Sequence, residues 1–186
     1  MEQNPFEAVS VNVIGTKNMV DLSEAYKADK CILISSDKAV NPTSVMGATK
    51  RIAELLISYK EKSNTKFIMT RFGNVLGSNG SVIPQFIKQI EAGGPLTITH
   101  KNMKRYFMTI PEATQLVLEA SVMGLGHDLF VFDMGKPIEI YELAKNIIAL
   151  SGLQHPEDIA IKLIGLRPGE KIFEELLIDS ETIKPT

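Results

Sequence analysis

The fold class is indicated most clearly by residues 31–60, which read CILISSDKAVNPTSVMGATKRIAELLISYK. The first part, 31–36, is a short apolar run of the kind that buried parallel strands show. Apolar residues then recur at helical spacing, which predicts a helix over about 46–62. A strand followed by a helix is the repeating unit of parallel α/β folds, so the stretch indicates that class.

The same alternation extends in both directions from this stretch. Pro5 suits a first helical turn and opens a predicted helix over about 5–27. The pattern further predicts strands over 67–72, 95–99, 128–133 and 159–165, and helices over 82–91, from about 111, over 140–150 and after 167–171. Residues 73–81 read as a glycine-containing loop. We therefore predict one α/β domain with a parallel sheet and flanking helices.

Composition narrows the class of protein. The chain has 186 residues, 44% hydrophobic and 23% charged, which is typical of one globular domain. A net charge of -2 with scattered lysines and arginines argues against a nucleic-acid partner. The single cysteine, Cys31, excludes an internal disulfide and suits a reducing compartment, most simply the cytoplasm. Neither a membrane-spanning run nor a metal-ligand spacing is expected.

A glycine-rich turn near the start is missing. Doubly wound nucleotide-binding domains normally begin with a strand, such a turn and a helix whose N-terminus holds the pyrophosphate. Here Gly77, Gly80, Gly93 and Gly94 follow other kinds of element. We expect that the N-terminal glycine-rich βαβ half is absent from this chain.

Polar residues gather directly after the first predicted strand. Ser35, Ser36, Asp37 and Lys38 follow its carboxyl end, the edge at which open α/β sheets bind ligands. Lys50 lies on the next helix, so hydroxyls, an acid and two amines can meet at this edge. A polar loop with surface charges explains this segment equally well, and taken alone the segment leaves both interpretations open.

The wider motif SSDKAVNPTSVMGATKRIAE, residues 35–54, resembles UDP-N-acetylglucosamine 4,6-dehydratases of capsule and glycan synthesis, the CapD-like family of extended short-chain dehydrogenases. Ser36 matches the family's hydroxyl residue, Lys50 its lysine, and Asp37-Lys38 its added acid–base pair. Met46 stands where short-chain dehydrogenases carry tyrosine, as is common in the membrane-linked branch of the family. Segments 4–18, 71–86, 104–113 and 165–176 agree with the family in the expected order.

The resemblance implies a Rossmann-like fold and a set of binding residues. Residues 1–75 would be the remainder of the Rossmann-like half, with the active-site strand and helix, and residues 76–186 mostly the nucleotide-sugar-binding part. It implies cofactor contacts from Ser35, Lys50, Phe72 and Asn74, and substrate contacts from Asn74, Ser78, Ser81, Val82, Arg105, Arg167 and Glu170. Taken singly, Asn74 could be a turn residue, Arg105 a solvated charge and Arg167 a surface ion pair.

The activity implied is NAD-dependent water loss from a UDP-sugar. The resemblance makes Lys38 the base at carbon 5 and Asp37 the acid for the leaving hydroxyl, with Ser36 and Lys50 completing the catalytic set. Because Met46 cannot move a proton, deprotonation of the carbon-4 hydroxyl falls to Asp37, Lys38 or a water held by Ser36. The alternatives are a 4-epimerase of the same superfamily and a non-catalytic fragment that binds nucleotide sugar or serves assembly.

Three expectations concern the isolated chain. It should be inactive alone and hold NAD weakly, because its cofactor site is incomplete. The strand at 31–36 should lie at a sheet edge, which is a template for pairing with another chain. We also expect a homo-oligomer through the helices at 5–27 and 46–62, which match those through which relatives dimerise.

Overall fold

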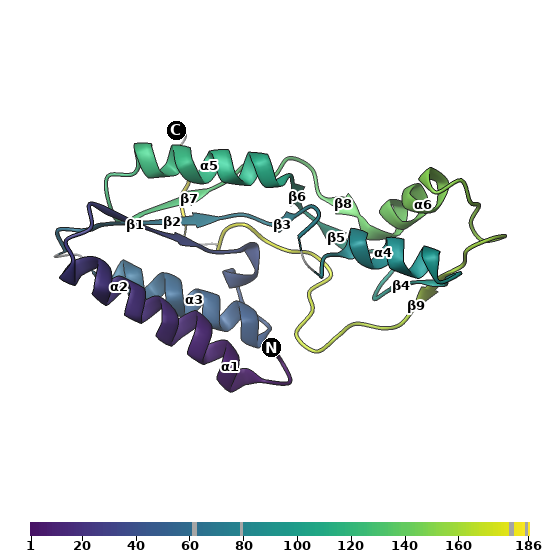
Figure 1. Cartoon of the computed structure of the whole chain (residues 1–186), viewed down its shortest axis with the longest axis horizontal. Helices are drawn as coiled ribbons and strands as arrows, with labels where there is room; N and C mark the ends of the chain where they lie inside the picture. Colours follow the sequence, from purple (N-terminus) through teal and green to yellow (C-terminus); the bar gives the residue numbers. More distant parts are fainter. Residues whose placement is uncertain (61–62, 79, 179–180, 185) are drawn as a thin grey trace. The chain divides into compact units, whose positions relative to one another are not determined.

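A computed structural model describes residues 1–60, 63–78, 80–178, 181–184 and 186 (Figure 1). The chain divides into two compact units. Unit 1 comprises residues 1–72, 114–133 and 175–186, and unit 2 comprises residues 73–113 and 134–174. Parallel strands with flanking helices confirm the predicted α/β class.

Unit 1 is built on a three-stranded parallel sheet in the order β1-β2-β7. Its strands are β1 (Lys30–Ile34), β2 (Lys66–Arg71) and β7 (Asp128–Val131). The register pairs Leu33 with Met69 and Met69 with Leu129, so these side chains point to one face. Within the described residues β1 pairs only with β2, which confirms the edge position predicted for residues 31–36.

Helices cover both faces of this sheet (Figure 1). One face carries α3 (Val45–Ser58) and a continuous helical stretch made of α1 (Pro5–Val9), the π-helical turn η1 (Ser10–Ile14) and α2 (Gly15–Ala25). The other face carries α5 (Ile110–Met123), which belongs to unit 1 from Thr114 onward. The helices predicted over 5–27 and 46–62 are therefore confirmed, with slightly earlier ends.

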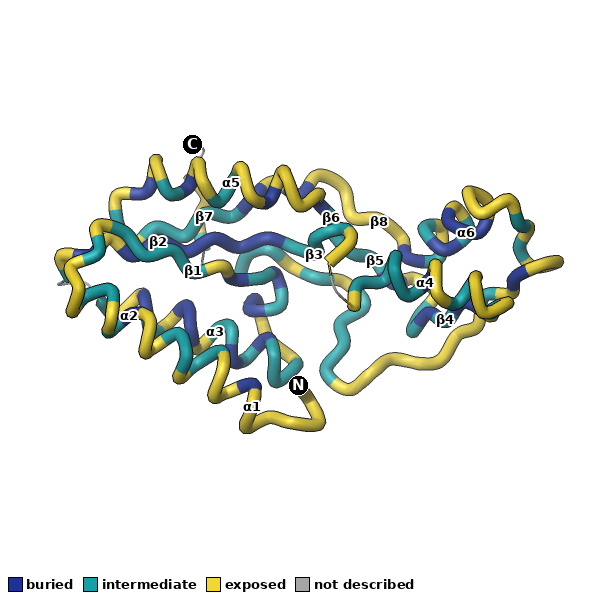
Figure 2. Tube along the Cα trace, viewed as in Figure 1, coloured by how far each residue is buried: buried dark blue, intermediate teal, exposed yellow. Residues whose placement is uncertain are grey.

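The residues that α3 buries differ from the regularly spaced apolar residues that predicted the helix, which we call its apolar stripe. Ile52 and Tyr59 of that stripe are 42% and 82% exposed. The helix instead buries small and polar residues together with one isoleucine: Gly47, Thr49, Ala53, Glu54 and Ile57. The core beneath this helix consists of Val20, Ile57, Phe67 and Met69 (Figure 2).

Unit 2 combines two helices with short paired strands. The elements are β3 (Asn74–Val75), α4 (Val82–Glu91), β4 (Leu96–Ile98), β5 (Lys104–Arg105), β6 (Phe107–Met108), β8 (Ile138–Glu139), α6 (Ile140–Leu150) and β9 (Ile161–Leu163). Strand β3 pairs with β6 and β4 with β9 in parallel, whereas β5 and β8 are antiparallel. The core includes Phe86 from α4, Leu96 and Ile98 from β4, and Ile148 from α6.

The helix predicted after residues 167–171 is wrong. The described residues 166–178 contain turns and no helix. Pro168 and Gly169 disfavour helix continuation, and the carbonyls of the next residues are already engaged. The Arg105 guanidinium donates to the carbonyls of Lys171 and Ile172, and the Lys104 amide also donates to Ile172. These acceptors are therefore unavailable for intrahelical bonds.

Candidate active site

The first part of the candidate site is the loop after β1, which we call the site loop and define as residues 35–40. Ser36 caps a single 3₁₀ turn, η2 (Asp37–Ala39), because its hydroxyl accepts a hydrogen bond from the Lys38 amide at 3.3 Å. The Asp37 amide donates to the Phe72 carbonyl at 3.0 Å. The loop is thus tied to the segment that follows β2.

Three predicted catalytic residues meet at the Asp37 carboxyl group. The Asp37 side chain is fully buried, and its Oδ1 accepts hydrogen bonds from Ser36 Oγ at 2.9 Å and Lys38 Nζ at 2.8 Å. The second oxygen, Oδ2, is buried and has no hydrogen-bond partner among the described residues. A buried polar atom without a partner is unusual in native proteins, and a catalytic role is one of the reasons for which such an atom is retained.

Lys50, on α3, lies close to the start of the site loop. Its ammonium donates to the carbonyl of Ile34 at 3.1 Å, immediately before the site loop. Burial lowers the pKa of the Lys50 ammonium, and the charge of the nearby Glu54 carboxylate opposes that shift. The structure therefore brings Ser36, Asp37, Lys38 and Lys50 to the carboxyl end of β1, as predicted.

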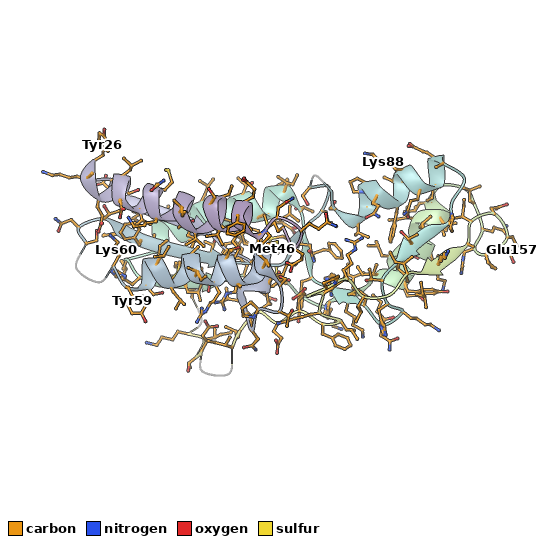
Figure 3. All side chains as sticks on the ribbon, turned by 90° about the horizontal axis from the view of Figure 1, so that it is seen from below. Tyr26, Met46, Tyr59, Lys60, Lys88 and Glu157 are labelled. Carbon is orange, nitrogen blue, oxygen red and sulfur yellow. The ribbon has the colours of Figure 1, made fainter. Side chains whose placement is uncertain are left out.

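Gly47 explains how closely α3 approaches the site loop. A Cβ atom at this position would lie 2.2 Å from the Lys38 carbonyl oxygen and 3.1 Å from Pro42 Cβ. Only glycine permits this contact, so the first turn of α3 helps to define the position of Lys38. Met46, which we aligned with the tyrosine of short-chain dehydrogenases, lies in the same turn (Figure 3).

Phe72 has a packing partner of its own. Its ring stacks on Phe132 with the centroids 5.3 Å apart and the planes 1° from parallel. Phe72 is buried, and its carbonyl oxygen accepts the amide of Asp37 in the site loop. Ser35, the other predicted cofactor residue of this loop, is also buried, and its hydroxyl donates to Glu54 Oε1 at 2.5 Å.

The second part of the candidate site lies in unit 2, at the start of α4. Ser81 is the residue before the helix, and its Oγ is buried with no partner among the described residues. Val82 is the first residue of the helix, and Ser78 accepts a hydrogen bond from the Ser81 amide at 3.0 Å. Asn79, within the predicted stretch from Ser78 to Val82, lies outside the described residues.

Arg105 and Glu170 come together in unit 2 although they are far apart in the sequence. Arg105 donates to the carbonyls of Lys171 and Ile172 at 2.7 and 3.0 Å, and its Nη2 lies 3.8 Å from Glu170 Oε1. The other oxygen of Glu170 accepts the Arg167 amide at 3.0 Å, while Arg167 itself is exposed. The predicted residues Arg105, Arg167 and Glu170 thus form one local group.

Asn74 is positioned by strand pairing. Its amide nitrogen and its side-chain Nδ2 both donate to the Tyr106 carbonyl, each at 3.0 Å. These two hydrogen bonds to one carbonyl fix the side chain at the start of β3. Asn74 follows Gly73, the first residue of unit 2. The predicted site residues therefore form two groups, each ordered within its own unit.

Sequence reasoning missed a buried charged cluster in unit 1. Arg71, at the end of β2, is fully buried and forms ion pairs with Glu54 and Glu181. A signal was present, because an arginine closes the apolar run FIMTR and a glutamate lies on the buried face of α3. Hydrogen bonds from Arg71 and Ser35 outweigh the effect of burial and hold the pKa of the Glu54 carboxyl below its usual value.

The described residues offer neither a metal site nor a membrane-spanning helix. No three of their histidine, cysteine, aspartate or glutamate side chains gather closely enough to hold a metal ion. None of their helices has the length and apolarity needed to cross a bilayer.

Comparison with known sequences identifies relatives along the whole chain. Residues 1–186 match the family described as "Polysaccharide biosynthesis protein". The chain is 56% identical to the capsular polysaccharide biosynthesis protein CapD of Staphylococcus aureus, over 97% of the chain and 30% of CapD. Identity to the probable polysaccharide biosynthesis protein EpsC of Bacillus subtilis is 57%, again over 97% of the chain and 30% of EpsC. A UDP-glucose 4-epimerase of Rickettsia bellii is 40% identical over 97% of the chain and 52% of that protein.

Solved structures support the fold. The X-ray structure of Pen from Bacillus thuringiensis superposes with a TM-score of 0.88 at 42% identity, covering 95% of this chain and 56% of Pen. The dTDP-glucose 4,6-dehydratase DesIV of Streptomyces venezuelae, solved with NAD bound, gives a TM-score of 0.82 at 16% identity, over 95% of this chain and 61% of DesIV. The second likeness concerns the fold alone. The chain spans about a third of the length of CapD and EpsC.

Proposed function

Because the chain belongs to the family of polysaccharide biosynthesis proteins, we propose that it is the acid–base and nucleotide-sugar-binding part of an NAD-dependent 4,6-dehydratase for UDP-N-acetylglucosamine or a similar substrate. The observation that carries this proposal is the buried Asp37 carboxyl group. One of its oxygens is held by Ser36 and Lys38, and the other is buried with no partner in the part of the chain that the structure describes. A substrate hydroxyl would supply the missing hydrogen bond.

The residues present fit one end of NAD. Lys50 places a partly buried ammonium at the carboxyl end of β1, the edge at which α/β sheets bind nucleotides. Lys50 and the backbone near Ser35 would hold the nicotinamide–ribose end. When bound, NAD supplies reversible hydride transfer to and from the sugar. A glycine-rich strand–turn–helix unit for the pyrophosphate does not occur in this sequence, so we expect weak binding by the isolated chain.

Asp37 and Lys38 divide the elimination between them. Once carbon 4 of the sugar is a ketone, the proton on carbon 5 becomes acidic. Lys38 would remove that proton, the bond between carbon 6 and its hydroxyl oxygen would break, and Asp37 would protonate the leaving hydroxyl to give water. Their hydrogen bond of 2.8 Å shows that the two side chains are adjacent, as action on two neighbouring sugar carbons would require.

The proton of the carbon-4 hydroxyl must be removed by a residue other than the usual tyrosine. Met46 stands at that position, and its side chain cannot accept or donate a proton. Ser36 donates its own hydroxyl proton to Asp37 Oδ1. The Ser36 oxygen also accepts from the Lys38 amide, which fixes its orientation. We therefore retain Asp37, Lys38 and a water held by Ser36 as the candidates for this step.

The polar groups of unit 2 suit a nucleotide diphosphate. The start of α4 offers amide N–H groups, the positive end of the helix dipole and the Ser81 hydroxyl, which has no partner among the residues that the structure describes. Arg105 and Arg167 add positive charge that can bind phosphate or ribose oxygens, with Glu170 oriented between them. Among solved relatives of the fold, a UDP-N-acetylglucosamine 4-epimerase from Methanobrevibacter ruminantium was crystallised with UDP-N-acetylmuramic acid.

A 4-epimerase is the second candidate, because the Rickettsia bellii relative carries that name. Epimerisation requires hydride transfer without water loss, so an acid–base pair for elimination would have no task. Incubation of the complete protein with UDP-N-acetylglucosamine and NAD separates the two by mass spectrometry. We expect a product about 18 Da lighter, whereas an epimer would keep the substrate mass.

An unchanged substrate would favour the third interpretation, a nucleotide-sugar-binding or assembly fragment. We expect this outcome for the isolated chain. A cytoplasmic location is also proposed for this part of the protein, on the basis of its single free cysteine.

We further propose a homo-oligomer formed through the helices of unit 1. Large apolar side chains lie exposed on these helices: Phe6, Val11, Ile14, Met19, Leu22, Tyr26, Ile52, Leu55 and Tyr59. So many exposed apolar side chains on the helices of one unit favour an interaction surface. Light scattering at high concentration should give at least twice the monomer mass. Replacing Tyr26 and Tyr59 by glutamate should lower it, and a monomeric wild-type chain would contradict the proposal.

A further inference from the structure

A second group of buried charges in unit 1, separate from Asp37 and Lys38, lies at the carboxyl ends of β1 and β2. We call it the Arg71 cluster, and it consists of Ser35, Arg51, Glu54, Arg71 and Glu181. Glu54 and Arg71 are fully or almost fully buried, and Arg51 and Glu181 are partly buried. Two arginines face two glutamates, so the cluster carries no net charge.

Hydrogen bonding in the cluster is saturated at its centre. Arg71 donates from Nε to Glu54 Oε1 at 3.1 Å and from Nη2 to Glu54 Oε2 at 2.8 Å. It also donates to the Leu176 carbonyl at 3.0 Å and to both oxygens of Glu181 at 2.7 and 3.1 Å. All five N–H groups of its guanidinium are therefore used. A fully satisfied buried network holds its members in one geometry.

Glu54 connects this centre to the site loop. Its Oε1 accepts the Ser35 hydroxyl at 2.5 Å as well as Arg71 Nε, and its Oε2 accepts Arg51 at 2.8 Å as well as Arg71 Nη2. Ser35 is the first residue of the site loop. The residue before it, Ile34, is held by Lys50, one helical turn before Glu54 on α3.

Three points along α3 therefore contact the site loop or the residue before it. Gly47 lies against the Lys38 carbonyl, Lys50 binds the Ile34 carbonyl, and Glu54 binds the Ser35 hydroxyl. The first two contacts involve residues already placed in the site. The third depends on a carboxylate whose geometry is set by Arg71, and Arg71 is in turn set by Glu181.

We infer that Glu54 is a positioning residue for the Ser36–Asp37–Lys38 turn, acting through Ser35 and held in place by Arg71 and Glu181. The inference rests on the proposed function only for the chemistry that the turn performs. Its physical basis is that stability alone does not require such a cluster, because well-packed apolar residues of similar volume often stabilise a fold equally well. A saturated network adds a fixed geometry at Ser35.

The inference is tested on the 186-residue chain without any ligand. Amide hydrogen exchange measured by NMR reports how often the site loop opens, through the amides of Asp37, Ala39 and Val40. The Asp37 ¹³Cγ chemical shift reports separately on its contacts with Ser36 and Lys38. The variants are Glu54→Gln, Ser35→Ala and Ser35→Thr, with Glu24→Gln as the matched control, since Glu24 pairs with Lys60 elsewhere in unit 1.

Glu54→Gln and Ser35→Ala should each raise exchange of the loop amides by about tenfold and shift the Asp37 ¹³Cγ resonance, because both break the same hydrogen bond. The two effects should not add in the double variant. Ser35→Thr keeps the hydroxyl and should restore the wild-type values. The control Glu24→Gln should change loop exchange less than twofold.

Two results would overturn the inference. If loop exchange stays at the wild-type rate in Ser35→Ala and Glu54→Gln, the turn is held without the cluster. If exchange rises equally across β2 and β7, the cluster only stabilises unit 1. Should Glu54→Gln fail to fold, Ser35→Ala, which removes one hydroxyl, decides the question alone. Failure of the complete protein to bind or convert a UDP-sugar would refute the proposed function and leave this result unchanged.

Discussion

Arg71 in unit 1 and Arg105 in unit 2 use the same side chain in different ways. Arg71 is fully buried, and its five N–H groups all bond within unit 1, four of them to carboxylate oxygens. The Arg105 side chain is 11% exposed, donates to three backbone carbonyls and only approaches Glu170 and Glu174, at 3.8 Å. Arg71 is thus bonded mainly to carboxylates, whereas Arg105 is bonded to backbone carbonyls and has two carboxylates nearby.

This difference suits the separate tasks that we propose for the two units. Acid–base residues need a fixed geometry, which we infer that the saturated cluster supports in unit 1. A diphosphate needs positive charge at an accessible position, and the exposed Arg167 is our main candidate in unit 2. Substitutions in the Arg71 cluster should therefore lower the stability of the fold, and substitution of Arg167 should lower the affinity for a UDP-sugar.

The largest effect on stability is expected from Arg71→Met. The substitution leaves Glu54 buried without its main partner, and removing one member of a buried ion pair typically costs about 3–5 kcal/mol. Urea unfolding followed by circular dichroism measures the loss. Arg105→Met should cost about 1–2 kcal/mol by the same measurement, because its hydrogen bonds go to backbone carbonyls and its nearest carboxylates lie 3.8 Å away. Equal losses of unfolding free energy in Arg71→Met and Arg105→Met would contradict the difference described between the two arginines.

A smaller effect is expected from Gly47→Ala. The new Cβ would meet the backbone oxygen of Lys38 at 2.2 Å, so either α3 or the site loop must move. Overpacking of this kind costs about 1–3 kcal/mol. Gly15→Ala is the matched control, because the nearest atom to its Cβ is 3.6 Å away and alanine favours a helix by about 1 kcal/mol. The two substitutions should change the urea midpoint in opposite directions.

Arg167→Ala should leave stability unchanged and weaken binding of a UDP-sugar. The backbone bond from the Arg167 amide to Glu170 remains, so the local turn is preserved. Loss of one charged contact to a diphosphate should reduce affinity by about tenfold, as measured by calorimetric titration of the complete protein. Lys162→Ala, which removes an exposed charge of the same unit, is the control. Equal affinity for Arg167→Ala and the wild type would remove Arg167 from the proposed site.

The sequence predicted those parts of the molecule that depend on local pattern. The strands at 31–36 and 67–72 and the helices over 82–91 and 140–150 are confirmed, since apolar runs and helical spacing determine them. The convergence of Ser36, Asp37, Lys38 and Lys50 was also predicted, because residues after a parallel strand and on the next helix meet at the same edge of a sheet.

The remaining features depend on contacts that no local pattern encodes. The apolar stripe of α3 identifies a helix, but Ile52 and Tyr59 face outward while Glu54 faces inward. The segment after residue 167 forms turns because Arg105, distant in the sequence, binds its carbonyls. The strands β3, β5, β6 and β8 have two residues each, which is too short for a periodic signal.

The proposed mechanism depends on separate roles for Lys38 and Asp37. Deuterium incorporation at carbon 5 of the sugar in heavy water tests these roles, using a complete protein whose glycine-rich half is present. Lys38→Met should abolish both water loss and deuterium entry, with a rate loss of about 10²–10⁴, and Met46→Leu should change little. Asp37→Asn should block water loss while deuterium still enters carbon 5. Continued deuterium entry in Lys38→Met would show that another residue is the base and would contradict the assignment.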